Sequence, residues 1–187
     1  MSSSNKNKLL LNDLTNEMIS KLFEPNSSNI TKASKALHEG GLVVFPTETV
    51  YGLGADATNE AAVKKIYTAK NRPKNNPLIV HVGTIEKAKS IACFSKVEML
   101  LANQFWPGPL TLILNSNSKL ISQKVRAGLE TIAIRVPKNP IAISLLNTFG
   151  KPIAAPSANR SGEISPTLAE HTLDLKEKID MILDGKY

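Results

Sequence analysis

The sequence predicts an α/β fold in which helices flank a mixed β-sheet. From residue 30 onward, short apolar runs alternate with segments whose apolar residues recur at helical spacing. Several of these runs are joined by short links and others by helices, so we expect both antiparallel and parallel strand pairs. No repeat or Gly/Ser-rich linker interrupts residues 30–183. We therefore expect a single domain over residues 27–187, after an N-terminal extension of residues 1–26 with one helix.

The first half of the domain carries two helices and two strands. Ile30, Ala33 and Leu37 share one helical face, and two glycines at 40–41 end that helix. The Gly52-Leu53-Gly54 segment is interpreted as a tight turn, since glycine permits unusual backbone angles. The other expected segments are a strand over 42–45, a helix marked by apolar residues 62–67 and a strand over 78–82.

The second half begins with a helix-start signal. Ser95 and Glu98 have the spacing of a capping box, and the apolar residues from Val97 to Phe105 continue it as an amphipathic helix. A Pro-Gly-Pro sequence at 107–109 ends that helix. The remaining expected segments are strands over 110–114, 131–136 and 152–155, a helix from Asn139-Pro140 and a second capping box at 167–170.

The cysteine content and the lengths of the apolar runs indicate the cellular compartment in which the protein folds. Cys93 is the one cysteine in the sequence, and it lies in a run that predicts a buried helical turn in a reducing compartment. The first eight residues are polar, and no apolar run approaches the roughly 20 residues of a membrane span. We therefore expect a cytoplasmic protein that does not cross a membrane.

The positive charge is concentrated in one segment. The formal net charge is +7, and residues 64–74 hold five cations and no acid. Such a cluster suits the phosphates of a nucleotide or a nucleic acid, although a solvated helix face would have the same composition. The five cations are Lys64, Lys65, Lys70, Arg72 and Lys74.

Several common sites are absent from the sequence. The Gly-x-Gly-x-x-Ala pattern at 52–57 is not followed by the acidic residue that a dinucleotide site needs, because residues 61–85 contain no Asp or Glu. There is no P-loop and no Gly-x-Ser-x-Gly elbow. The three histidines are far apart in sequence, so we expect no protein-built metal site.

Two polar segments each follow a predicted strand. Residues 46–54 and 155–162 are rich in Thr, Ser, Asn and Gly, and α/β sheets bind ligands where strands end. Between them lies Lys-Asn-Arg-Pro at 70–73. Ordinary turns remain an alternative for each segment by itself.

Six motifs in order identify a family resemblance. They are Pro-Thr-Glu-Thr-Val-Tyr-Gly-Leu-Gly (46–54), Lys-x-Arg-Pro (70–73), Asn-Pro-Leu-Ile-Val-His (76–81), Trp-Pro-Gly-Pro-Leu-Thr (106–111), Arg-Val-Pro (135–137) and Ser-x-Asn-x-Ser-Gly (157–162). Together they resemble the YrdC-like threonylcarbamoyl-adenylate synthase family over residues 29–184. The resemblance implies a YrdC-like twisted mixed sheet.

The resemblance also implies an activity and its residues. Members of the family make threonylcarbamoyl-adenylate and pyrophosphate from ATP, L-threonine and bicarbonate, with Mg2+ accompanying ATP. Their product serves a tRNA threonylcarbamoyl-transfer complex, which forms t6A in tRNAs that read ANN codons. Matching motif positions assigns catalysis to Lys70, Arg72, Ser157 and Asn159. The same matching assigns L-threonine binding to Thr49, His81, Arg135 and Ala155, and nucleotide binding to Arg72, Asn76, Thr131, Ser157 and Ser165. Without the resemblance, His81 would be interpreted as a satisfied core histidine.

Alternatives remain at this point. A non-catalytic paralogue that binds double-stranded RNA or tRNA would show affinity that falls steeply with salt, and weak RNA binding is compatible with the basic segment. A carbamoyl-adenylate-forming relative would ignore threonine. Family members continue past Ile-Leu-Asp-Gly into a strand that supplies a serine and an arginine, so we expect that C-terminal strand to be missing from residues 1–187.

Overall fold

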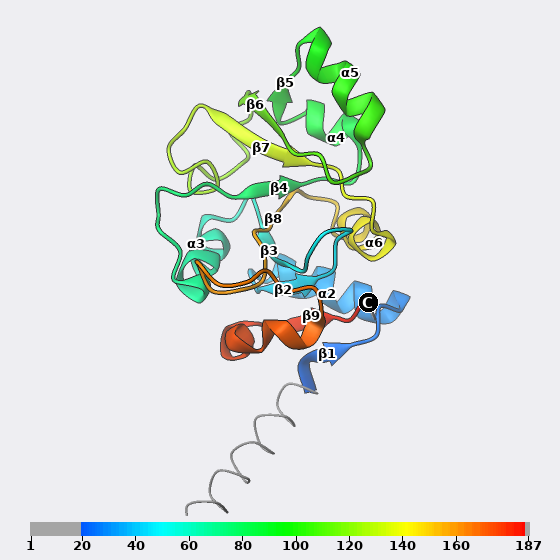
Figure 1. The fold of residues 1–187 in the computed structure, drawn as a ribbon, viewed down its shortest axis with the longest axis vertical. Helices are drawn as coiled ribbons and strands as arrows, with labels where there is room; N and C mark the ends of the chain where they lie inside the picture. The colour runs from blue at the N-terminus through cyan, green and yellow to red at the C-terminus, as the bar shows by residue number, and fades with distance from the viewer. Residues whose placement is uncertain (1–19, 186–187) are drawn as a thin grey trace, which may run out of the picture.

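The computed structural model describes residues 20–185, and within them nine strands form one sheet (Figure 1). The strand order is β1-β9-β2-β3-β8-β4-β7-β6-β5. The strands are β1 (Leu22–Phe23), β2 (Val43–Phe45), β3 (Gly52–Asp56), β4 (Ile79–His81), β5 (Ala92–Cys93), β6 (Leu112–Ser116), β7 (Thr131–Arg135), β8 (Ile153–Ala154) and β9 (Met181–Leu183).

Parallel and antiparallel pairs occur together in this sheet, as predicted. β9 pairs in parallel with β1 and β2, and β4 pairs in parallel with β7. The pairs β2–β3, β3–β8, β4–β8, β5–β6 and β6–β7 are antiparallel. The α/β fold with a mixed sheet is therefore confirmed. Leu22 and Phe23, which fall in the predicted extension, form the edge strand β1. Residues 1–19 of that extension lie outside the described residues, so the helix expected in it stays a prediction.

The helices are α2 (Ser27–His38), α3 (Glu60–Lys70), α4 (Ile85–Lys89), α5 (Lys96–Phe105), α6 (Pro140–Phe149) and a 3₁₀ helix, η1 (Ala169–Lys178). The first turns of the five α-helices are closed by side chains that accept backbone N–H groups. Asn59 caps α3, and Asn139 caps α6 with Pro140 in the first turn. The capping box of Ser95 and Glu98 is present at α5, as predicted. The helix expected from the 167–170 signal is the 3₁₀ helix η1 and not an α-helix.

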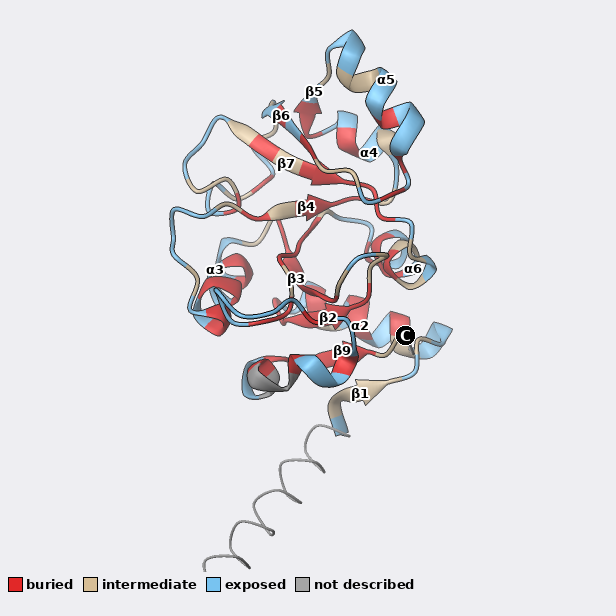
Figure 2. Ribbon diagram, in the orientation of Figure 1, coloured by how far each residue is buried: buried red, intermediate tan, exposed pale blue. Residues whose placement is uncertain are grey.

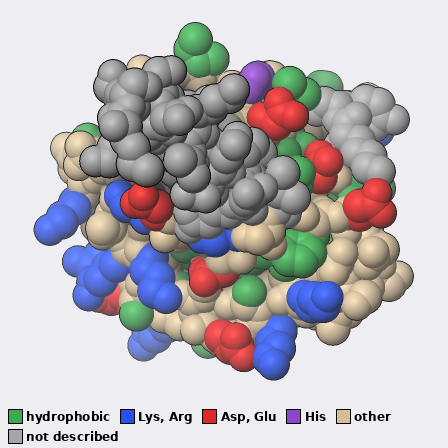
Figure 3. Space-filling view, turned by 90° about the horizontal axis from the view of Figure 1, so that it is seen from below, with side chains coloured by type: hydrophobic (Ala, Val, Ile, Leu, Met, Phe, Trp, Pro, Cys, Tyr) green, Lys and Arg blue, Asp and Glu red, His purple; other side chains and the backbone are tan. Residues whose placement is uncertain are grey.

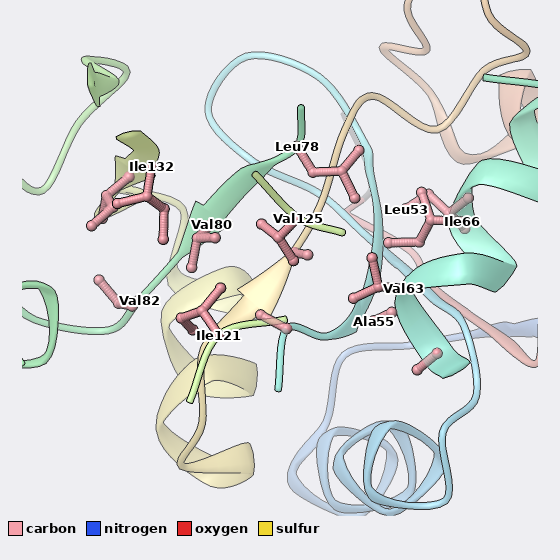
Figure 4. Close-up of a cluster of buried hydrophobic side chains, with 14 of the residues drawn as sticks. Leu53, Ala55, Val63, Ile66, Leu78, Val80, Val82, Ile121, Val125 and Ile132 are labelled. Atoms are coloured by element: carbon pink, nitrogen blue, oxygen red, sulfur yellow. The ribbon is translucent and has the colours of Figure 1, made fainter. Parts of the chain in front are cut away.

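Apolar side chains pack against both faces of the sheet. One cluster joins α2 and α6 to the sheet through residues such as Leu37, Phe45 and Leu145. The other cluster lies between α3 and the sheet, where Leu53, Val63 and Ile66 meet in Figure 4. The central strands β2, β3, β4 and β8 are almost entirely buried (Figure 2). The loops at their ends are thus held on a rigid support.

The far end of the sheet departs from the sequence prediction at Cys93 and shows an uncovered apolar helix face. Cys93 is exposed on β5 and does not lie in a buried helical turn, because a two-residue strand at the sheet edge is covered on one side only. The helix predicted over 97–105 is present, but its large apolar side chains, including Leu100 at 70% exposure, face outward. Only Ala102 of α5 is buried (Figure 2). Helical spacing predicts an apolar face but does not show what covers it.

Gly52 and Gly54 lie in β3, so the tight turn expected there was wrong. Their role is close packing across the sheet. A Cβ atom at Gly54 would lie 2.8 Å from Phe45 Cε1 and 2.9 Å from Ile153 Cγ2. Both neighbours belong to the buried strands next to β3, so they have little room to move.

No helix in residues 20–185 combines the length and the apolar character needed to cross a membrane.

The packing at Gly54 predicts that Gly54→Ala lowers the free energy of unfolding by about 1–3 kcal/mol, since the added methyl overpacks a buried contact. Urea unfolding measures the change. Gly150→Asn is the control, because Gly150 has φ +75° with no atom near its Cβ position, and asparagine tolerates that conformation. A Gly54→Ala variant as stable as this control would show that the strands can separate without cost.

Candidate active site

A small pocket opens where the loop after β2 meets the ends of β4, β7 and β8. Its volume is about 60 Å³, and because one water needs roughly 10–15 Å³ on this measure, it holds a small molecule or part of a larger one. Among its lining residues are Thr49, His81, Arg135, Ala155 and Ser157. The structure thus brings together all four residues predicted to bind threonine and one predicted catalytic residue.

Strand register places the two basic side chains of the pocket next to each other. His81 is the last residue of β4 and Arg135 the last of β7, and these parallel strands pair His81 with Arg135. Residues directly opposite each other point to the same face of a sheet. Ala155 follows β8, and its N–H donates to the carbonyl of Ile79 on β4. Three strands therefore supply one wall of the pocket.

Because Gly52 has no side chain, the segment around Ser157 can lie close to β3 across the pocket. Gly52 forms an isolated antiparallel bridge with Ser157, and a Cβ atom at Gly52 would lie 3.3 Å from Ala155 Cβ. The N–H of Leu53 donates to the carbonyl of Pro156 at 2.8 Å. The polar segments 46–54 and 155–162, which the sequence marked separately, are in this way hydrogen-bonded to each other.

Arg135 is 7% exposed, and its guanidinium has three partners, which come from two other segments of the chain. The guanidinium Nη2 lies 2.8 Å from Glu48 Oε1 and donates to Thr49 Oγ1 at 3.1 Å, while Nε donates to the carbonyl of Gly108 at 3.3 Å. A buried cation without such partners would be very costly. These partners therefore compensate the buried charge of Arg135.

The sequence analysis did not assign a role to Glu48. Its Oε2 accepts the N–H of Lys138 at 3.0 Å and that of Asn139 at 3.4 Å, so the carboxylate joins Arg135 to the turn before α6. Burial raises the pKa of Glu48, but the hydrogen bonds from Arg135 and the backbone outweigh burial and lower it overall. The signal that could have identified Glu48 is an acidic residue in the polar loop, because Arg135 had to be neutralised.

His81 is buried at 3% exposure and lies edge-on to the ring of Phe45, with 6.1 Å between ring centroids. Burial, followed by the charge of Arg135, lowers the pKa of His81 to about 3. The imidazole is therefore neutral near pH 7. Its Nδ1 is buried and has no hydrogen-bond partner within residues 20–185, which differs from a satisfied core histidine.

Lys70 joins the Lys-x-Arg segment to the Ser-x-Asn segment. The last residue of α3, it is 1% exposed, and its Nζ donates to the backbone carbonyls of Ser157, at 2.6 Å, and Asn159. In return, the N–H of Ser161 donates to the carbonyl of Lys70. Burial, followed by the charge of Arg72, lowers the pKa of Lys70 to about 8. The ammonium is mainly charged near neutral pH.

Arg72 and Asn76 form a second contact close by. Arg72 Nη2 donates to Asn76 Oδ1 at 2.8 Å and to the carbonyl of Pro77 at 2.9 Å. Two of the residues predicted to face the nucleotide are thus held together. Thr131 lies at the start of β7, four residues before Arg135, and Ser165 lies in an exposed loop. Neither Thr131 nor Ser165 lines the pocket of Arg135.

Asn159 fixes the loop that carries it. Its Nδ2 donates to the carbonyls of Arg160 and Glu163, both at 2.8 Å. Its Oδ1 is buried and has no partner in the described part of the chain. Beside the charge of Lys70, this oxygen is an acceptor that a donor group of a ligand can use.

Comparison with known proteins identifies the family. Residues 35–187 match the sequence model of the Sua5/YciO/YrdC family, which carries the description Telomere recombination. The chain belongs to this family. The resemblance inferred from the six motifs is therefore confirmed.

Relatives in the Sua5/YciO/YrdC family include enzymes and solved structures. Threonylcarbamoyl-AMP synthase of Bacillus subtilis is 49% identical over 183 residues, which make up 96% of this chain and 51% of that protein. P. abyssi Sua5 complexed with L-threonine is 46% identical with a TM-score of 0.83, over 88% of this chain and 48% of that one. E. coli YciO is 26% identical with a TM-score of 0.79, over 89% and 83%. The chain spans about half the length of the first two relatives.

The basic segment of this family member divides into two groups. Lys70 is buried and Arg72 half-buried, whereas Lys64, Lys65 and Lys74 are exposed. On the face shown in Figure 3, Lys and Arg side chains project outward with acidic side chains among them. Lys64 itself pairs with Glu60 at 2.8 Å. The solvated-face interpretation therefore fits the three exposed lysines, and phosphate binding by Lys70 and Arg72 stays a prediction.

The depressed pKa of Lys70 predicts a pH dependence of stability. The pKa falls from 10.5 in the unfolded chain to about 8 in the folded one, so between these values the unfolded state binds more protons and stability rises with pH. The unfolding free energy of the wild type minus that of Lys70→Met should therefore rise by up to about 3 kcal/mol from pH 8 to 10.5. Chemical denaturation of both proteins measures it. A difference that does not vary with pH would show that Lys70 keeps its ordinary pKa.

Proposed function

We propose that the protein is an L-threonylcarbamoyladenylate synthase, which forms threonylcarbamoyl-AMP and pyrophosphate from L-threonine, bicarbonate and ATP. The observation that carries the proposal is the contact of Lys70 with the carbonyls of Ser157 and Asn159, because it joins two anion-binding segments beside the pocket of Arg135. Relatives named threonylcarbamoyl-AMP synthase, and one structure complexed with L-threonine, support it. They favour synthesis over the non-catalytic RNA-binding alternative.

The pocket of Arg135 would bind threonine. Arg135 offers its guanidinium to the substrate carboxylate, which is the pairing that its planar geometry favours. Thr49 and neutral His81 offer a hydroxyl and an imidazole to the polar groups of threonine. The volume of about 60 Å³ suits a small amino acid. Ala155 shapes the wall and carries no polar side chain into it.

The reaction needs two anions to meet. The amine of threonine attacks bicarbonate to give a carbamate and water, and a carbamate oxygen then attacks the α-phosphorus of ATP and expels pyrophosphate. Lys70 and Arg72 supply positive charge where these negative groups approach, and a charge held in place before reaction stabilises a transition state effectively. Ser157, Asn159 and Asn76 offer hydrogen-bonding groups to the nucleotide. Thr131 and Ser165 are proposed to reach it from farther along the sheet and loop.

Mg2+ is proposed to arrive with ATP. In residues 20–185, no cluster of three or more His, Cys, Asp or Glu side chains could hold a metal ion. The phosphates would then supply most of its ligands. The product would pass to a tRNA threonylcarbamoyl-transfer complex for t6A formation, and we place the reaction in the cytoplasm, where ATP and tRNA are available. Weak RNA binding by the exposed lysines is compatible with this.

Pyrophosphate release tests the proposed function. The 187-residue protein should release pyrophosphate from Mg-ATP only when L-threonine and bicarbonate are both present. Lys70→Met and Arg72→Lys should each lower the rate at least about 100-fold, because each removes charge or donor geometry that acts on the transition state. Lys74→Met is the control, since Lys74 is an exposed cation in the same segment, and it should keep the wild-type rate. Release that ignores threonine would contradict the proposal.

A further inference from the structure

We propose that Glu48 is a positioning residue for amino-acid binding, which acts through Arg135. The inference rests on the proposed function and adds a residue to its threonine site. Glu48 Oε1 lies 2.8 Å from Arg135 Nη2, and the side chain of Glu48 is 19% exposed. Arg135 lines the pocket, whereas Glu48 does not. The carboxylate therefore holds the guanidinium from outside the pocket.

The second oxygen of Glu48 is held as firmly as the first. Oε2 accepts the N–H groups of Lys138 and Asn139, just before the first turn of α6. Asn139 in turn caps α6 by accepting the N–H groups of Ile141 and Ala142. A long, flexible arginine side chain loses about 2 kcal/mol of rotamer entropy when it is fixed. Because Glu48 is anchored next to the start of α6, Arg135 loses part of this rotamer entropy before any ligand binds.

The other contacts of Arg135 orient its guanidinium less firmly than Glu48 does. Thr49 Oγ1 accepts from the same Nη2 at 3.1 Å, but Thr49 is itself exposed whereas Glu48 is half-buried, and the carbonyl of Gly108 contacts Nε only at 3.3 Å. Glu48 is the charged partner of Arg135 in the described residues. An ion pair that is largely withdrawn from water is screened much less than an exposed one. Removing the charge of Glu48 should therefore let the guanidinium leave the orientation that a ligand carboxylate needs.

Glu48→Gln is the informative variant. The amide keeps the size of the side chain and an oxygen that can accept from Lys138, but it removes the negative charge beside Arg135. We expect the Kd for L-threonine, measured by calorimetry, to rise about ten-fold, which is the size of coupling found between neighbouring charged groups. The KM for threonine in the pyrophosphate assay should rise equally, with the KM for ATP changed less than about two-fold.

Glu60→Gln is the matched control. Glu60 also pairs with a cation at 2.8 Å, but its side chain is 52% exposed on α3, so threonine affinity should stay at the wild-type value. A double variant tests the route of the effect. In an Arg135→Lys background, Glu48→Gln should add less than about two-fold, because Glu48 acts only through the guanidinium.

The outcomes separate the two proposals. A wild-type protein that does not bind L-threonine overturns the proposed function and this inference with it. Threonine binding that Glu48→Gln leaves unchanged overturns the inference alone. Equal rises in the KM for threonine and for ATP, with a lowered Tm, would assign Glu48 to general support of the fold and also overturn it. Additive effects in the double variant would mean that Glu48 contacts the ligand directly and would overturn the positioning role.

Discussion

The constraint on which the site depends is the cost of burying positive charge. Lys70 and Arg135 are almost fully buried in a sheet made mainly of apolar residues, and each keeps its charge because other segments come to it. Two backbone carbonyls meet the ammonium of Lys70, and a carboxylate, a hydroxyl and a carbonyl meet the guanidinium of Arg135. These partners lie far away in sequence. Compensating the charges therefore also assembles the loops.

The fold makes this assembly possible through its strand order. β4 and β8 lie side by side at the centre of the sheet, with β3 and β7 on either side, so four segments end or begin near one another. The helix pair α2 and α6 supports one face, and α3 supports the other and delivers Lys70 from its last turn (Figure 1). Rigid central elements and polar loops at their ends are the usual arrangement of α/β binding sites.

Much of this arrangement could be predicted from the sequence. Apolar runs and capping signals placed β2, β4, β6, β7, β8 and the longer helices, whereas β3 was interpreted as a turn and β9 was not predicted. The family motifs singled out residues that the fold brings to one pocket, including His81, Arg135 and Ser157. The short edge strands β1 and β5 were not predicted, because two residues carry no periodic signal. The exposure of Cys93 and of the apolar face of α5 depends on distant packing, which local spacing does not record.

Glu48 shows the same limit at the level of a single residue. An acidic residue in a loop has many partners available, and only the folded structure shows that Arg135, at the end of β7, lies beside it. His81 is a related case, because its lowered pKa comes from burial and from a neighbour on another strand. In both cases the residue type was visible in the sequence, but the electrostatic surroundings required the fold.

The close approach at Gly52 has a consequence for how this site tolerates mutation. The segment that holds Ser157 and Asn159 comes near β3 because Gly52 has no side chain. A substitution there would press on Ala155 and displace a loop encoded much later in the gene, without changing any side chain that offers a polar group to a ligand. Random mutagenesis should therefore find loss of function at a position with no chemical role. The functional site therefore includes a position, Gly52, where only the absence of a side chain matters.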